Sequence, residues 1–379
     1  ASAQNGPLLP TCGKDQDERL RAQAAGSKVN GIASSLQNRD RYTDYVTRVH
    51  RKLFVLSAGN IIYADGETNS DYTSNKAYNA VIVGGTYETG AVMDGNRPST
   101  ESCAPAKPMG SAFRNDTNGQ EIPNITAVGH CVGLWGGMYY TGTSFSAPAV
   151  SGIAAGLMEY NTNLQTWPEG MKAILLASPY GPGSSSPDGC DWRQVKNAQG
   201  VCNTGDGRDG TGLVNGFWAK RMADPAKKLR NNAVANWGHD YGTMRASEFD
   251  SATLQWSSSW NAISGTSCTP VNRRMRVALA WDSNPVCDAG TRQCSSDQLK
   301  MNLDLRVYRM PDNVLVAQSE TAANSYEHVD LALDEQRGAC SPSGPNYTYK
   351  IVVRLANKSS LAATEETPFG IAWHTYLPS

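Results

Sequence analysis

Ser144 lies in a short segment whose residue types are suited to nucleophilic catalysis. The segment Gly142–Pro148 reads Gly-Thr-Ser-Phe-Ser-Ala-Pro, and small apolar residues fill Ala147–Met158 after it. Together with Met138–Tyr140, this order predicts a short strand, a tight glycine turn and a helix with Ser144 at its N-terminus. Unpaired N–H groups and the positive end of the helix dipole meet there, so an oxyanion would be stabilised. The alternative is a serine that only caps a buried helix.

Asn60 ends a second segment that could serve the same chemistry. Lys52–Asn60 reads as a strand closed by Ala-Gly-Asn, and Ala80–Gly85 reads as the next buried strand. With the Ser144 segment, these residues resemble the subtilisin-like serine proteases, whose nucleophile motif is GTS-x-[AS]-x-P and whose AGN asparagine points into the oxyanion hole. The resemblance implies that Ser144 is the nucleophile and Asn60 an oxyanion donor, with Gly59 at the substrate.

The residues that should activate the serine do not follow the family pattern. The resemblance implies a histidine that takes the serine proton and an aspartate that holds the histidine. In the family both precede the AGN segment, in an HGTH-like motif and a D-[ST]-G motif, and neither motif occurs in this sequence. His130, after Gly129, falls where the family has its APG turn and is a candidate replacement base. The main expectation is that the Asp and His come from an upstream segment of the same precursor, which would be a partner of this chain.

The elements around these motifs predict an α/β fold. We expect a subtilisin-like parallel sheet with helices on both faces, its N-terminal portion missing. Ile32–Leu36 resembles the strand that walls the S1 pocket, so Ser35 and Leu36 are expected to contact substrate. Tyr42–Arg51 reads as an amphipathic helix, and Pro168–Ala177 reads as a helix with proline in its first turn.

The last third of the sequence has a different pattern. Short strands of alternating polarity, of which Arg274–Trp281 is one, are separated by Asp, Asn, Gly and Pro. This pattern predicts an all-β jelly-roll or sandwich domain, and it resembles the one attached to some subtilisin-like proteases. Asp282, Asn302 and Asp304 could supply oxygen ligands to a structural Ca²⁺, with turn-capping carboxylates as the alternative. No cofactor is expected for catalysis. The expected divisions are an irregular segment 1–27, a partial catalytic domain 28–245 and a β-sandwich 246–379.

The composition indicates which classes of partner and which compartment are expected. The 34 Lys and Arg nearly balance the 35 Asp and Glu, and no basic run or membrane-length apolar stretch occurs, which argues against nucleic acid and membrane. Nine cysteines indicate an oxidising compartment and hence a secreted, processed chain. Zinc is the competing use of cysteine, but no CxxC pair occurs. The expected pairs are Cys103 with Cys131, Cys190 with Cys202, Cys287 with Cys294 and Cys268 with Cys340, leaving Cys12. The glycosylation sequons begin at Asn115, Asn124, Asn346 and Asn357.

These features favour one function and leave two others open. The leading hypothesis is a secreted subtilisin-like serine endopeptidase that hydrolyses polypeptide substrates. The second is a catalytically dead secreted scaffold of the same fold that binds a peptide or protein. An intact Ser144 and Asn60 favour the protease, whereas the missing Asp and His favour the scaffold. The third, a glycan-binding β-sandwich protein, depends on fold analogy alone.

Overall fold

The computed structural model covers the chain in two units, residues 1–35 and 36–379. What is described belongs to the second unit and comprises residues 36–62, 73, 75–87, 109–111, 120–133, 139–179, 194–196, 202–204, 210–230, 234–263, 273–333 and 348–377. Several sequence predictions therefore lie outside the described residues: the segment 1–27, the strand up to Ser35, and Cys12, Cys103, Cys190, Cys268, Cys340, Asn115 and Asn346.

A parallel sheet carries the predicted catalytic segments. Its order is β1 (Val55–Ser57), β3 (Val81–Thr86), β5 (Ile125–Val128), and both pairings are parallel. The 18-residue helix α3 (Thr143–Tyr160) packs on these strands with the side chains of Ala147, Val150, Ala154 and Leu157. The α/β expectation is confirmed for this part of the chain.

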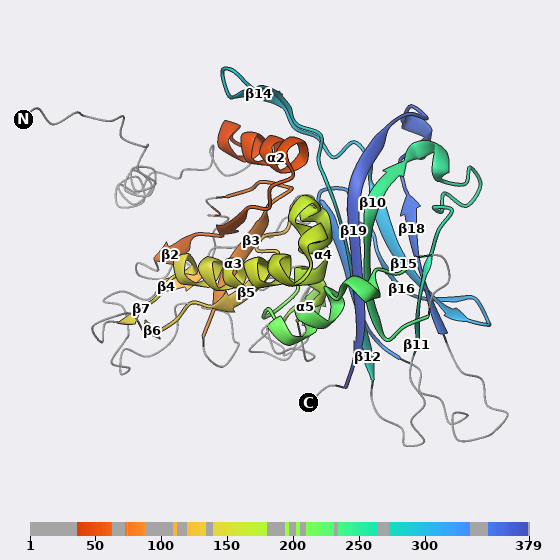
Figure 1. Ribbon diagram of the computed structural model, residues 1–379, viewed down its shortest axis with the longest axis horizontal. Coiled ribbons are helices and arrows are strands. Elements are labelled where there is room, and N and C mark those ends of the chain that lie inside the picture. The colour runs from red at the N-terminus through yellow and green to blue at the C-terminus, as the bar shows by residue number, and fades with distance from the viewer. Residues whose placement is uncertain are drawn as a thin grey trace, which may run out of the picture. The chain divides into compact units, whose positions relative to one another are not determined.

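The described residues form three further α-helices, which are α2 (Asn38–His50), α4 (Pro168–Ala177) and α5 (Gly216–Met222). In Figure 1, α4 and α5 lie beside α3 toward the C-terminal strands, while α2 lies above them. Helix α4 matches its predicted bounds, because Pro168 needs no N–H donor in a first turn and every residue of the helix is buried. Helix α5 begins after Asn215, whose Oδ1 accepts hydrogen bonds from the N–H groups of Phe217 and Trp218. None of the described helices is long and apolar enough to cross a membrane.

Helix α2 differs from the sequence expectation in its buried face. The predicted amphipathic helix would bury apolar residues, but the residues that α2 buries are Asp40, Asp44 and Thr47. Each of the two aspartates accepts hydrogen bonds from main-chain N–H groups of residues 76–79. The helix is therefore held by polar contacts as well as by packing.

The C-terminal part forms two antiparallel sheets of four strands each. Their strand orders are β10-β19-β12-β17 and β11-β18-β15-β16. One hydrophobic cluster lies between them, so the sheets form a sandwich. The strands are β10 (Trp237–Arg245), β19 (Glu366–Tyr376), β12 (Arg274–Trp281), β17 (Tyr326–Ala332), β11 (Trp260–Ile263), β18 (Thr348–Leu355), β15 (Leu303–Met310) and β16 (Val314–Ser319).

This sandwich begins before residue 246 and is not isolated from the α/β part. Strand β10 starts at Trp237 and pairs along its whole length with β19. On β12 and β19 the large apolar side chains face the sandwich interior, whereas Ala278, Ala280, Gly370 and Ala372 on the other face are small. A Cβ on Gly370 would lie 2.3 Å from the carbonyl oxygen of Glu169 in α4. The small residues let α4 lie directly on the sheet, and one core continues from α3 through α4 to these strands.

The part of the chain that the structure describes also contains four two-stranded ribbons. Two of them flank the Ser144 segment, and a third, β13–β14, packs on α2 and contains the Cys287–Cys294 disulfide. This disulfide confirms one of the expected pairs. The ribbons are β2 (Asn60–Ile62) with β4 (Met109–Ser111), β6 (Val132–Gly133) with β7 (Tyr139–Tyr140), β8 (Gln194–Lys196) with β9 (Cys202–Thr204), and β13 (Val286–Asp288) with β14 (Gln293–Ser296).

Candidate active site

Ser144 is the second residue of α3 and is exposed to solvent. The residue before the helix is Gly142, whose φ of +154° disfavours side chains other than hydrogen. A Cβ at this position would also lie 3.2 Å from Nδ2 of Asn60. The glycine therefore lets the turn before Ser144 approach the Asn60 side chain closely.

Asn60 is joined to this turn by hydrogen bonds across 83 sequence positions. Its Oδ1 accepts from the main-chain N–H of Thr143 at 2.8 Å and from the Thr143 hydroxyl at 3.1 Å. Gly59 donates its N–H to the same hydroxyl at 3.2 Å. Both acceptor bonds fall on Oδ1, so the Nδ2 group stays available as a donor, and among the described residues it has no acceptor. The two motifs singled out in the sequence thus meet in the fold.

A third contact fixes the turn from the end of β5. The N–H of Gly142 donates to the carbonyl of Gly129 at 2.8 Å, and the N–H of Gly129 donates to Thr86 at 3.0 Å. A Cβ on Gly129 would lie only 2.3 Å from Oγ of Ser146 and 2.8 Å from the Gly142 carbonyl. A glycine is needed here because the backbone of β5 lies against the start of α3.

No histidine lies within hydrogen-bonding distance of Ser144, although all five histidines are among the described residues. The ring of His130 is buried and packs edge-on against Tyr87 with centroids 4.9 Å apart, and its Nε2 lies 3.6 Å from Sγ of Cys131. The Ser144 hydroxyl has no hydrogen-bond partner within the described part of the chain. The structure therefore joins Asn60 to Thr143, the residue before Ser144, and shows no hydrogen bond between Ser144 and the candidate base His130.

The remaining histidines lie on α2 or in the C-terminal sheets. His50 is exposed at the end of α2, and His328 is buried on β17. Burial lowers the pKa of His239 to about 4 and that of His374 to about 3. His374 lies 2.9 Å from the carbonyl of Ala177 and stacks on Trp218, so it is a neutral core residue.

The expected substrate and calcium residues are dispersed. Leu36 precedes α2, while Ser35 lies outside the described residues. Asp282 follows β12 in one sheet of the sandwich, whereas Asn302 directly precedes β15 of the other sheet and Asp304 is the second residue of that strand. Asp304 pairs with Arg354 at 2.9 Å. Within the described ranges no group of three or more His, Cys, Asp or Glu is arranged to hold a metal ion.

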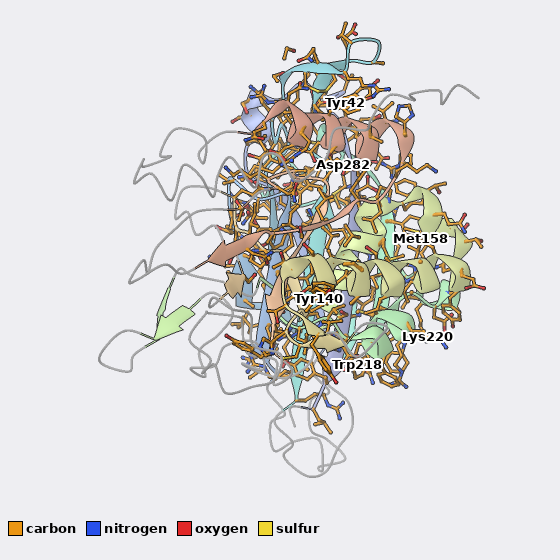
Figure 2. All side chains as sticks on the ribbon, turned by 90° about the vertical axis from the view of Figure 1, so that its left-hand side faces the viewer. Tyr42, Tyr140, Met158, Trp218, Lys220 and Asp282 are labelled. Carbon is orange, nitrogen blue, oxygen red and sulfur yellow. A yellow bond between two sulfur atoms is a disulfide. The ribbon has the colours of Figure 1, made fainter. Side chains whose placement is uncertain are left out.

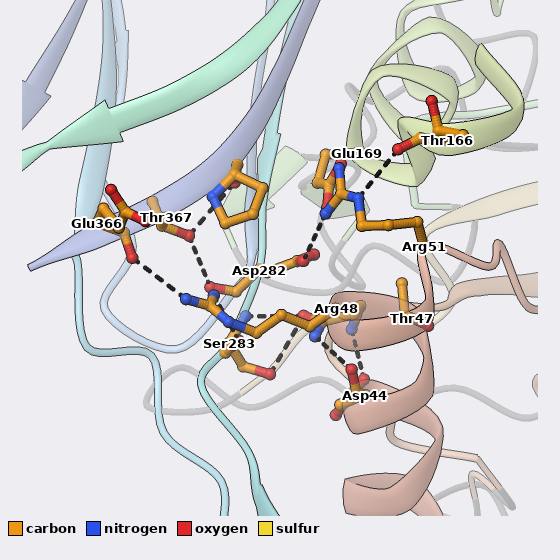
Figure 3. A network of polar contacts seen from close by, with 12 residues as sticks. Asp44, Thr47, Arg48, Arg51, Thr166, Glu169, Asp282, Ser283, Glu366 and Thr367 are labelled. Carbon is orange, nitrogen blue, oxygen red and sulfur yellow. Dashed lines mark hydrogen bonds and ion pairs between the residues drawn. The ribbon is translucent and has the colours of Figure 1, made fainter. Parts of the chain in front are cut away.

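Asp282 belongs instead to a buried polar network that the sequence did not reveal (Figure 3). Arg51, at the end of α2, donates to both oxygens of Glu169 in α4, at 2.5 and 2.6 Å, and its Nη1 lies 3.7 Å from Asp282 Oδ2. Burial and the Glu169 carboxylate raise the pKa of Asp282, and Arg51 and Arg48 oppose this shift. Arg48 extends the network by donating to the carbonyls of Ser283 and Glu366.

A second acidic pair lies in the same junction. Burial and the neighbouring Asp297 carboxylate raise the pKa of Asp44, whose oxygens accept from the N–H groups of Tyr78 and Asn79. The Lys172 ammonium donates to the Tyr78 carbonyl at 2.6 Å, and its burial lowers its pKa to about 8. The junction between α2, α4 and the sandwich thus holds charged groups at low solvent exposure.

Two covalent expectations are also resolved in part. Cys131 is disulfide-bonded, with its expected partner Cys103 outside the described residues. The sequon at Asn124 falls on a buried residue, which is 2% exposed and whose Oδ1 accepts the N–H of Ile82 at 2.8 Å. The Asn357 side chain is only part-buried, but it bonds Asn302 and Lys300.

Comparison with known proteins assigns the chain to a family. The model of the Subtilase family (Peptidase_S8) matches residues 11–207, which is just over half of the 379 residues. The chain belongs to this family, and the matched range contains both Asn60 and Ser144. No curated protein matches it. One solved structure, the periplasmic PliG inhibitor of g-type lysozyme from Aeromonas hydrophila, is 11% identical with a TM-score of 0.20, covering 38% of this chain and 88% of that one. A likeness this weak carries no functional argument.

Proposed function

We propose that the chain is the C-terminal part of a secreted subtilisin-like serine endopeptidase. Ser144 attacks the carbonyl carbon of a peptide bond, and the Asn60 amide and the Ser144 main-chain N–H stabilise the resulting oxyanion. The histidine that removes the serine proton, and the aspartate that orients it, come from a segment other than the residues described here. Disulfide bonds at Cys287–Cys294 and at Cys131 support an oxidising, extracellular setting.

The observation that carries the proposal is the meeting of the two motifs. Their segments are far apart in sequence, yet three hydrogen bonds join them: Thr143 donates twice to Oδ1 of Asn60, and the Gly59 N–H donates to Oγ1 of Thr143. These hydrogen bonds occupy the Oδ1 acceptor of Asn60, so its Nδ2 donor, which has no acceptor among the described residues, is left free at the turn before the exposed Ser144. A buried scaffold position would not need a free amide donor next to a solvent-exposed hydroxyl.

The chain's own residues supply electrostatics but not proton transfer. The N-terminus of α3 contributes only about 0.3–1 kcal/mol toward an anion in an ordinary setting. A serine becomes a fast nucleophile when an adjacent base takes its proton. The described residues place no such base at Ser144. The isolated chain should therefore be almost inactive, and the complementing segment should restore activity.

Labelling with a fluorophosphonate probe tests the proposal. The isolated chain should label negligibly, while the chain refolded with an upstream segment carrying the family's Asp and His should label at Ser144. Ser144→Ala should abolish the signal. Ser151→Ala is the matched control, since Ser151 is another exposed serine of α3 whose hydroxyl bonds its own helix at Ala147. It should label like the unmodified protein.

Two results would contradict the proposal in different ways. Rapid labelling of the isolated chain would show that it holds its own base, and His130 would be the first residue to replace. A correctly folded reconstituted protein that never labels would favour the alternative of a catalytically dead scaffold that binds a peptide or protein. The missing HGTH-like and D-[ST]-G motifs are the observation that keeps this alternative in place.

A further inference from the structure

A group of cations on and after α5 lies over aromatic rings. The Arg221 guanidinium is 4.4 Å from the ring centroid of Trp237, and Lys227 lies over the same ring at 5.4 Å. One residue before Arg221, Lys220 lies 5.4 Å over Tyr160, the last residue of α3. Arg221 also approaches two rings of its own helix, at 5.1 and 5.3 Å. We call this surface the basic–aromatic patch; its members are Tyr160, Phe217, Trp218, Lys220, Arg221, Lys227 and Trp237.

Within the described ranges, the cations of the patch have no carboxylate partner. Lys220, Arg221 and Lys227 form no ion pair with any described carboxylate. The nearby Asp224 instead caps a short turn by accepting the N–H of Ala226 at 2.9 Å. Arg230, just outside the patch, shows the contrast, since its Nε bonds Asp240 at 2.5 Å. On a chain whose formal net charge is −1, three unpaired cations form a local positive field.

The patch is also exposed and partly preorganised. Phe217 is 63% and Tyr160 is 45% exposed, and the side chains of Lys220 and Arg221 face solvent. Stacking on several rings restricts the rotamers of Arg221, so less entropy is lost when its planar group pairs with an anion. A guanidinium held in this way suits two-point binding of a carboxylate.

We propose that the basic–aromatic patch binds an acidic stretch of polypeptide. The choice of a polypeptide rests on the proposed peptidase function, and the choice of an acidic one rests on the unpaired cations. Figure 2 shows Trp218 and Lys220 close together on the side of the molecule where Met158 of α3 lies. Ser144 and Tyr160 stand at opposite ends of α3, about 24 Å apart at 1.5 Å per residue.

This separation makes the site distinct from the reaction centre. An extended chain spans about 3.3–3.6 Å per residue, so roughly seven residues would connect the two places. The patch therefore acts as an exosite that recognises acidic side chains about seven or more residues from the bond at Ser144. It would raise the local concentration of such substrates rather than contact the reacting atoms.

Binding of a fluorescein-labelled polyglutamate peptide, followed by anisotropy, tests the inference. The protein carries Ser144→Ala, so cleavage cannot interfere, and a neutral Gly-Ser peptide serves as the negative probe. An exposed ion pair contributes up to about 1 kcal/mol, which is about fivefold in affinity, so the double variant Arg221→Gln/Lys227→Gln should bind about tenfold or more weakly. Binding should weaken further as salt is added.

Matched variants distinguish specific binding at the patch from an effect of net charge and from an effect of misfolding. Lys52→Gln/Arg292→Gln removes two exposed cations elsewhere and should leave the affinity unchanged. Arg221→Lys keeps the charge but loses the stacked planar group, so its affinity should fall between those of the parent and the double variant. Each variant should unfold within about 5 °C of the parent, because only exposed cation–π contacts are lost.

Failure of the inference can be told from failure of the proposed function. Polyglutamate that does not bind, or binds the patch variants as tightly as the parent, overturns the inference even if Ser144 labels in the reconstituted enzyme. If phosphatidylserine vesicles bind in a patch-dependent way and polyglutamate does not, the ligand of the patch is a lipid surface and the inference of a polypeptide is wrong. If the peptide binds but Ser144 never labels, the inference about the patch stands and the proposed peptidase function is wrong.

Discussion

Replacing Asp282 by Asn should make the protein more stable at neutral pH. The Asp282 carboxyl is 4% exposed and shares its surroundings with the carboxylate of Glu169, which already takes both donors of Arg51. Burial and this neighbour raise the native pKa of Asp282 above its ordinary value. An asparagine of the same shape carries no charge, and its amide can donate to Glu169 as the protonated acid would.

The sign follows from the number of protons that each state binds. Above about pH 4 the unfolded chain has released the Asp282 proton, whereas the native state still holds it, so the native state binds more protons. Stability therefore falls as pH rises from about 4 to the native pKa of Asp282. One such group costs at most about 1.4 kcal/mol per pH unit in that window. The asparagine variant should be spared this loss.

Buried histidines contribute the opposite trend, which the variant should reveal. His239 and His374 have native pKa values of about 4 and about 3, well below the unfolded value near 6.5. Their contribution is present above about pH 6.5 and is lost as pH falls toward their native values. In the parent this gain with pH is offset by the loss at Asp282 and at Asp44. The variant's stability should therefore rise more steeply between about pH 4 and 6.5.

Urea unfolding at several pH values between 4 and 8 measures this difference. At pH 4 the two proteins should be equally stable, and the variant should gain as pH rises. Asp250→Asn is an opposite-sign control: hydrogen bonds from Thr253 and Ala252 lower the pKa of this exposed carboxyl, so its removal should reduce stability above pH 4. If Asp282→Asn is instead destabilised and this loss grows as pH rises, Asp282 is needed as an anion for Arg51 and the reasoning is wrong.

Two further outcomes are expected. Gly129→Ala should lower the free energy of unfolding, measured in denaturant melts, by about 1–3 kcal/mol, because its Cβ would meet Oγ of Ser146 and the carbonyl of Gly142. It should also reduce Ser144 labelling of the reconstituted protein. Labelling at the parent rate would show that this contact does not position the serine. Asn124 should carry no glycan in peptide mass spectrometry of secreted protein, since its side chain is buried and bonded to Ile82; a glycan there would mean that the β3–β5 region is not folded as described.

Local patterns were sufficient where one residue type marked a boundary or a face. Pro168 marks the first turn of α4, and the Gly142–Pro148 segment marks the start of α3. The alternation in Arg274–Trp281 predicted a strand. It arises because the two faces of this strand pack against different parts of the protein. Large residues of β12 fill the sandwich while Ala278 and Ala280 meet α4.

Elements whose residues are selected by distant partners could not be predicted in this way. Strand β10 contains Gly238, which offers no alternation; a Cβ there would lie 2.6 Å from the ring of Trp373, more than a hundred residues away. Likewise, Asp44 lies within the helix predicted at Tyr42–Arg51 and is buried, because the main-chain N–H groups of Tyr78 and Asn79 donate to its carboxylate. The sequence contains no local sign of either contact.

The candidate site was partly predictable because its two halves have different origins. In the proposed mechanism the oxyanion half depends on Asn60 and the turn before Ser144. Thr143 donates to Asn60 and Gly142 donates to Gly129, and these hydrogen bonds lie within this chain and need no histidine to form. Proton removal depends on residues that the described fold does not bring to Ser144. In serine proteases that lose a triad member, the oxyanion hole and substrate binding alone retain about 10³–10⁴-fold catalysis over water. An isolated chain with a correctly formed Asn60–Thr143 contact should therefore hydrolyse peptides at a residual rate of that order. Breaking this contact should abolish the residual rate, although the base is absent in both cases.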